Sequence, residues 1–347
     1  MRQISSHTAS ASRKDLSPVR GAPSAVKKAF RVLKVTFGIT ANDEQLLPKL
    51  FFSASFESLL TDFHAIEPIE YRDEGLDFYV TMTDVPGKPV EIQVSDREIQ
   101  LAGSILQATE QASDLRYTLF GNEGLVFRYI LMMLEKKHGI YSLHACSLYN
   151  EQANHLYIAA GATGSGKSCL LAKGLELGLK LFSAEMTHFY LDHGPIFYKG
   201  AVVDNIRIGN LKYSYPFLLE RLKGQLPETD DEWGRKVAVD LREMQTASDT
   251  IHSPKITLIL PRVEEGRRNN FTSRLKDKRV MQKALFDNIS EKIASNMLLY
   301  DSIPTGGLDS PTLMRNRYNA VDGLLNYVDR AVKVVAGSDN CWEGLMG

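Results

Sequence analysis

The stretch Gly161-Ala162-Thr163-Gly164-Ser165-Gly166-Lys167-Ser168 contributes most to predicting the fold of this chain. It matches G-x-x-x-x-G-K-[ST], the phosphate-binding loop (P-loop, or Walker A motif) of many nucleotide-binding proteins. The glycines let successive backbone N–H groups turn toward anionic oxygens, and the N-terminus of a following helix attracts the same oxygens. Lys167 supplies a mobile cation for the β- and γ-phosphates, and the Ser168 hydroxyl is an oxygen ligand of the kind that Mg²⁺ prefers. We therefore expect residues 161–169, Cys169 included, to bind a nucleoside triphosphate with Mg²⁺.

The pattern around this loop alternates apolar strands with amphipathic helices, which is typical of the α/β class. We expect strands at 140–148, 155–160, 179–183, 187–191 and 256–260. We expect helices at 122–138, 168–177 and 275–298, of which the first two end at Gly139 and Gly178. An apolar strand that leads into the loop and a helix that leaves it are the context that a P-loop requires.

Four regions follow from these patterns. Residues 1–25 are expected to be a flexible basic tail, and residues 26–118 a small N-terminal α/β domain. Within that domain, strands at 76–82 and 90–94 flank a Pro86-Gly87 turn, and a further strand is expected at 98–101. Residues 119–335 form the P-loop domain, and residues 336–347 a C-terminal tail.

Composition excludes several classes of protein. The 347 residues carry a net charge of -1, with 44% apolar and 24% charged residues, so no general attraction to nucleic acid or membranes is expected. The three cysteines, Cys146, Cys169 and Cys341, form no CxxC pair, and no apolar run is long enough to span a bilayer. The basic, serine-rich start resembles an organelle transit peptide, but a disordered tail and a cytoplasmic location are favoured.

Two other P-loop classes are disfavoured. The apolar run Ile256-Thr257-Leu258-Ile259-Leu260 ends in Pro261-Arg262, where many P-loop enzymes have an aspartate that holds Mg²⁺. A GTPase would need an N-K-x-D motif, which the sequence lacks. Asp231-Glu232-Trp233-Gly234 fits D-x-x-G, but no apolar strand precedes it, so it is expected to be a polar loop.

The order of motifs resembles HPr kinase/phosphorylase and the wider group of HPr kinase-related proteins. The resemblance, over roughly 120–300, depends on Leu143-His144-Ala145 before the P-loop and Gly178-Leu179-Lys180-Leu181-Phe182-Ser183-Ala184-Glu185 after it. It implies a P-loop domain with an HPr kinase C-terminal-like core, similar to phosphoenolpyruvate carboxykinase. It also implies transfer of phosphate from ATP to a serine or threonine hydroxyl.

The resemblance assigns roles position by position. His144 would orient the catalytic acid, and Glu185 would be a metal-site carboxylate. The family's first acid, the usual general base, is replaced by Ala184. Glu185 would then serve as both metal partner and base, or else His144 or Asp192 would take the proton.

Further assignments concern three other segments of the chain. Asp204-Asn205-Ile206-Arg207-Ile208-Gly209 stands where the family has E-I-R-G, with Asn205 at the acid. Arg262 would stabilise charge on the transferred phosphoryl group. His188 and His193 alternate along a strand and its turn, so a metal cluster there is not favoured.

The sequence thus predicts an ATP- and Mg²⁺-dependent kinase that acts on a hydroxyl group of a peptide, a small protein or a small molecule. Its catalytic residues would be Glu185, His144, Lys167 and Arg262, and its metal residues Ser168 and Glu185. The alternative is a nucleotide-binding regulatory or assembly protein with weakened catalysis. A homo-oligomer is a further expectation from the resemblance. The acceptor and the choice between ATP and GTP stay open.

Overall fold

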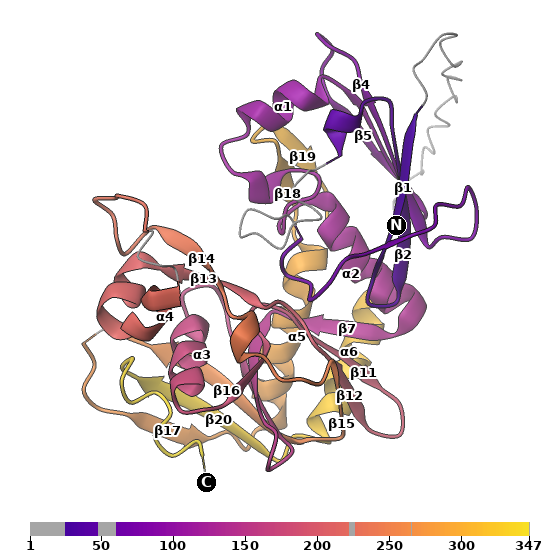
Figure 1. Cartoon of the computed structure of the whole chain (residues 1–347). Helices are drawn as coiled ribbons and strands as arrows, with labels where there is room; N and C mark the ends of the chain where they lie inside the picture. The colour runs from indigo at the N-terminus through magenta and orange to yellow at the C-terminus, as the bar shows by residue number, and fades with distance from the viewer. Residues whose placement is uncertain (1–24, 48–59, 222–225, 265, 347) are drawn as a thin grey trace, which may run out of the picture.

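The protein has a mixed α/β fold in a computed structural model that describes residues 25–47, 60–221, 226–264 and 266–346 (Figure 1). The tail predicted over residues 1–25 therefore lies almost wholly outside the described residues. Within the described part of the chain, no helix is both long and apolar enough to cross a membrane.

The N-terminal region is built on a six-stranded sheet in the order β3-β1-β2-β4-β6-β5. Its strands are β1 (Val26–Val32), β2 (Val35–Ala41), β3 (Glu67–Ile69), β4 (Phe78–Asp84), β5 (Glu91–Val94) and β6 (Glu98–Gly103). Alternate residues such as Phe37 and Ile39 point into its core. The predicted strands at 76–82, 90–94 and 98–101 correspond to β4, β5 and β6. The short segments beside the sheet are η1 (Glu44–Leu46), α1 (Ile105–Gln111) and η3 (Leu115–Tyr117).

The helix α2 (Leu125–His138) closes the core of this N-terminal sheet, although the sequence assigned it to the P-loop domain. The ring of Tyr129 lies 4.6 Å from that of Phe78, and the helix is buried without a break from Leu125 to Glu135. It ends where predicted, at Gly139, whose φ of 61° is left-handed. The boundary predicted between residues 118 and 119 therefore separates a sheet from the helix that covers it.

The P-loop lies on a second six-stranded sheet in the order β10-β8-β9-β16-β20-β17. Its strands are β8 (Ala145–Asn150), β9 (His155–Ala160), β10 (Lys180–Ser183), β16 (Lys255–Val263), β17 (Phe271–Arg274) and β20 (Arg330–Ala336). Strand β9 is apolar from Leu156 to Ala160 because both of its faces are buried. Tyr157 and Ala159 face α3 (Lys167–Glu176), while Leu156 and Ile158 face α5 (Lys278–Ala294) and α6 (Pro311–Leu325).

The strand predicted at 140–148 is two strands that belong to different sheets. Strand β7 (Ile140–Leu143) joins a four-stranded antiparallel sheet, whereas β8 pairs with β9 and β10. The chain passes from one sheet to the other at His144. The other strands of the four-stranded sheet are β11 (Thr187–Leu191), β12 (Pro195–Tyr198) and β15 (Thr250–His252).

Smaller elements complete the fold. They are β13 (Val203–Arg207), a π-helix (Asn210–Ser214), α4 (Pro216–Arg221), β14 (Lys236–Asp240), η5 (Arg242–Met244), β18 (Met297–Leu299) and β19 (Ile303–Thr305). Strand β13 pairs with β14, and β18 with β19. Met297, Leu299 and Tyr300 pack into the N-terminal core, so the chain returns to the first region late in the sequence.

The segment predicted as a C-terminal tail packs against the P-loop helix. Cys341, Trp342 and Leu345 are buried, and the indole Nε1 of Trp342 donates a hydrogen bond to the carbonyl of Leu170 at 2.6 Å. A Cβ at Gly174 would lie 2.7 Å from the Trp342 ring, so a glycine is needed where the helix meets this segment.

Candidate functional site

A pocket of about 350 Å³ opens over the N-terminal end of α3. Residues from the N-terminal region, the P-loop, β13 and the end of the chain line it. They are Asp62, Arg116, Tyr117, Asn122, Glu123, His144, Thr163, Gly164, Gly166, Lys167, Ser168, Cys169, Glu185, Asn205, Arg207, Asn210, Ser214, Trp233, Lys236, Val263, Lys292 and Ser338. Three of the four predicted catalytic residues, His144, Lys167 and Glu185, therefore share one pocket.

The P-loop connects β9 to α3 and has the backbone that its glycines predict. Gly164 and Gly166 have φ values of 84° and 94°, which L-residues rarely adopt. The Lys167 ammonium donates to the carbonyls of Gly161 at 2.7 Å and Ala162 at 3.4 Å. The amide of Val263 donates to the Ser165 carbonyl at 3.0 Å, which fixes the loop to β16. The loop is thus a tight turn at the start of a helix, the arrangement that binds anions.

Ser168 contacts Asp204, which directly precedes Asn205, the residue expected at the acid position. Its hydroxyl donates to Oδ1 of Asp204 on β13 at 3.2 Å. Oδ2 of Asp204 is buried and has no hydrogen-bond partner among the described residues. Burial, with the charge of Glu185, raises the pKa of Asp204 to about 7. Asn205, which the resemblance to HPr kinase-related proteins placed at the acid position, lines the pocket instead.

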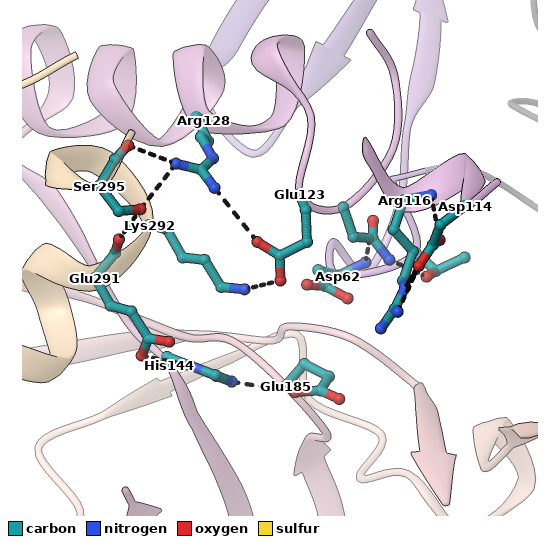
Figure 2. Close-up of polar contacts among 12 residues, drawn as sticks. Asp62, Asp114, Arg116, Glu123, Arg128, His144, Glu185, Glu291, Lys292 and Ser295 are labelled. Carbon is teal, nitrogen blue, oxygen red and sulfur yellow. Dashed lines mark hydrogen bonds and ion pairs between the residues drawn. The ribbon is translucent and has the colours of Figure 1, made fainter. Parts of the chain in front are cut away.

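His144 lies between two carboxylates (Figure 2). Its Nε2 is 3.5 Å from Oε2 of Glu185, and its Nδ1 is 2.9 Å from Oε2 of Glu291 on α5. Burial lowers the pKa of His144, but hydrogen bonds to the two carboxylates outweigh burial and raise it above its usual value. For Glu185 burial acts in the opposite direction and raises the pKa. The contact with His144 and the charge of Lys167 outweigh burial and bring the pKa of Glu185 below its usual value. This pairing favours an imidazolium next to an ionised Glu185.

A second group of charges, at the boundary with the N-terminal region, was not predicted from the sequence. Lys292 on α5 pairs with Glu123, and Arg128 lies 3.6 Å from the same carboxylate. Figure 2 shows the Asp62 carboxylate between Glu123 and Arg116, above the His144–Glu185 pair. Asp62 is 7% exposed, and burial together with the charge of Glu185 raises its pKa to about 8. The sequence around Asp62 holds no motif, so only the packing of the two regions reveals it.

Asp62 makes no side-chain hydrogen bond or ion pair with other residues in the described part of the chain. Its position is fixed through the backbone instead, because its amide donates to Oδ1 of Asn122 at 3.5 Å. Asn122 in turn donates to the Thr61 hydroxyl at 2.7 Å. The Asp62 carboxylate is therefore a positioned acid beside the pocket with acceptor capacity left over.

Arg262 does not line the pocket. Strand β16 extends through Val263, so neighbouring side chains point to opposite faces. Val263 lines the pocket, whereas Arg262 is 71% exposed and pairs with Glu264 at 2.7 Å. The strand was predicted to end at Leu260, before Pro261, whereas β16 continues to Val263, so the prediction that put Arg262 just past the strand end was wrong.

The remaining candidates also lie elsewhere. Asp192 and His193 are in an exposed turn after β11, and neither lines the pocket. His188 is fully buried, hydrogen-bonded to Ser142 at 2.8 Å and stacked on Phe63. Burial lowers the pKa of His188 to about 3, so this histidine is neutral. Ala184 is buried and contributes no polar group.

The site fits a metal ion that would be coordinated partly by protein oxygens and partly by substrate phosphates. Within the described residues, no group of three histidine, cysteine or acidic side chains is arranged to hold a metal on its own. The Ser168 hydroxyl, the unpartnered oxygen of Asp204 and the nearby Glu185 carboxylate are hard oxygen donors, as Mg²⁺ requires. Because Mg²⁺ is usually held by one or two carboxylates plus substrate phosphates, a sparse protein shell suits it.

No protein-family model matches this chain, and no curated protein sequence matches it.

Proposed function

We propose that the protein binds a nucleoside triphosphate with Mg²⁺ and transfers the γ-phosphate to a hydroxyl group. The main support is that Lys167, Ser168, His144 and Glu185, from three separate segments, line one pocket at the start of α3. The arrangement also supports an HPr kinase C-terminal-like core, because His144 precedes the P-loop strand and Glu185 follows the strand after α3. ATP is the proposed donor. The acceptor class is a serine or threonine of a peptide or protein, or a small alcohol.

The roles follow from the demands of phosphoryl transfer, which needs alignment and charge stabilisation more than covalent chemistry. Backbone amides of the P-loop and the Lys167 ammonium would hold the terminal phosphates. Ser168, Asp204 and Glu185 would hold Mg²⁺, which supplies charge neutralisation when bound. His144 would orient Glu185 and keep it ionised through their 3.5 Å contact.

The acceptor proton needs a base, because Ala184 cannot serve as one. Glu185 is held in its ionised form by His144, which suits it to a cation more than to proton exchange. Asp62 enters the pocket from the opposite region, and its pKa of about 8 lies near the pH at which acid–base catalysis is most effective. We propose Asp62 as the group that accepts the proton, with Glu185 as the alternative.

A second candidate function is nucleotide-dependent regulation or assembly without transfer. The observation that favours it is Ala184 at the position of the family's usual base. In that case the two regions that meet at the pocket would respond to nucleotide, and no phosphate would leave it.

One experiment distinguishes the two proposed functions. The full chain is incubated with ATP labelled at the γ-phosphate, Mg²⁺ and serine-containing peptides or small alcohols, and transferred label is measured. Lys167→Ala should abolish transfer and weaken nucleotide binding. Lys173→Ala, on the same helix and paired with Glu176, should leave both unchanged. Tight ATP binding with no label on any acceptor supports the regulatory function. Absence of any nucleotide binding contradicts both.

A further inference from the structure

The pocket has a second end that the transfer reaction does not use. There the lining comes from β13, the π-helix and the segment before β14, through Asn205, Arg207, Asn210, Ser214 and Trp233. In Figure 1 these elements lie on the left, whereas α2 and the N-terminal sheet lie on the upper right. The aromatic side chain in this group is Trp233, from the Asp231–Gly234 loop. Trp233 is 36% exposed, and tryptophan is enriched among the residues that contribute most to binding at protein interfaces.

This end of the pocket adjoins the P-loop helix just beyond the phosphate residues. Asn210 contacts the Sγ of Cys169 at 3.5 Å, and Cys169 directly follows Ser168. His144, Glu185 and Asp62, which form the transfer site, belong to other segments. A nucleotide whose terminal phosphates lie at Lys167 and Ser168 would therefore have its base and ribose directed to one end. The end near Cys169 has an aromatic ring and amide groups to meet them.

The indole is held in place by the π-helix and the glycine before it, and by a turn in its own loop. A Cβ at Gly209 would lie 2.6 Å from the Trp233 ring, so the ring packs directly on glycine backbone. The ring of Tyr213 is 6.0 Å away and nearly parallel, at 27°. Glu232, next to Trp233, accepts from Lys212 at 2.5 Å and from the Tyr213 hydroxyl at 3.0 Å. The Gly234 amide donates to Asp231 at 2.7 Å. A ring fixed in this way loses little conformational entropy when a ligand binds.

We propose that Trp233 stacks on the base of the purine nucleotide whose phosphates the P-loop holds. This inference rests on the proposed nucleotide site and adds the residue that binds the base. Stacking suits a purine because both partners present wide π-faces. It would also explain why a large aromatic ring stays partly exposed in a pocket lined by many polar groups.

The test compares ADP with inorganic pyrophosphate, which has the phosphates but no base. Affinities of the full chain are measured by calorimetry for wild type, Trp233→Ala and Trp233→Phe. Trp233→Ala should weaken ADP by about 5- to 100-fold, the range for loss of one stacked base, and should leave pyrophosphate within about twofold. Trp233→Phe should retain most of the ADP affinity.

Tryptophan fluorescence gives a test that needs no substitution. The chain has two tryptophans, and Trp342 is buried behind α3. ADP should quench the wild-type emission, pyrophosphate should not, and the ADP effect should vanish in Trp233→Phe. Unchanged ADP affinity in Trp233→Ala, or equal weakening of ADP and pyrophosphate, would overturn the stacking role alone. Failure of wild type to bind either ligand would overturn the nucleotide site itself.

Discussion

Alanine at Gly166 should damage the P-loop far more than alanine at Gly164. Both glycines have positive φ, so each alanine meets backbone strain of about 1–2 kcal/mol. At Gly164 the new Cβ has nothing within 4 Å, whereas at Gly166 it would lie 2.4 Å from the Cβ of Val263. Overpacking of this kind adds about 1–3 kcal/mol. We therefore expect a total loss of about 2–5 kcal/mol for Gly166→Ala, against about 1–2 kcal/mol for Gly164→Ala.

The assay is urea denaturation followed by circular dichroism, together with the affinity of each variant for pyrophosphate. Val263→Gly removes the atoms that the new Cβ would meet, so a double-mutant cycle isolates the clash. Gly166→Ala combined with Val263→Gly should recover about 1–3 kcal/mol relative to the sum of the single losses. Equal losses for the two alanine variants, or a coupling energy near zero, would show that the contact between the loop and β16 is not tight.

Three further predictions concern charged and titratable groups. Glu185→Gln should lower kcat for phosphate transfer by about 100-fold or more, with little effect on the Kd of ADP without Mg²⁺; transfer within tenfold of wild type would remove Glu185 from the mechanism. Asp62 binds its proton more tightly in the folded protein, with a pKa of about 8 against a usual 3.8, so the free energy of unfolding should fall as pH rises through that window. Asp62→Asn should flatten this fall in denaturation curves between pH 5 and 8, and an unchanged slope would contradict the burial argument. His188 stays neutral when folded, with a pKa of about 3 against 6.5, so stability should drop as pH falls below about 6.5, by up to about 1.4 kcal/mol per pH unit. His188→Gln should reduce that slope, and the same series of denaturation curves at pH 4 to 7 measures it.

Local patterns in the sequence were sufficient for the elements around the P-loop. The loop needs particular glycines, β9 is apolar on both faces, and α2 ends at a left-handed glycine; each is a local requirement that the chain displays. Helix α6 was missed even though Ser310 caps it and Pro311 opens it, because Arg317 interrupts its apolar face. Arg317 is fully buried and pairs with Asp309, just before the helix, and with Glu135 on α2, which lies far from it in sequence.

Candidate site residues close to the P-loop motif could be predicted from the sequence, whereas those brought to the pocket by tertiary packing could not. Lys167 and Ser168 were predicted from the P-loop motif, and His144 and Glu185 from their positions before and after it. Asp62 and Asp204 were not predicted as site residues, since each reaches the site only through tertiary packing. Arg262 was predicted to follow the strand, whereas β16 continues to Val263. Because neighbouring side chains of a strand point to opposite faces, Arg262 points away from the face on which Val263 lies.

The shared core of the N-terminal region has a practical consequence for dissecting the protein. A fragment that begins at residue 119 would carry α2 with its apolar residues turned to water, and it would tend to aggregate. A fragment that stops at residue 118 would lose both that helix and the Met297–Tyr300 contribution to the same interior. Neither half would report on the intact molecule, so binding partners and activity are best sought with the undivided chain.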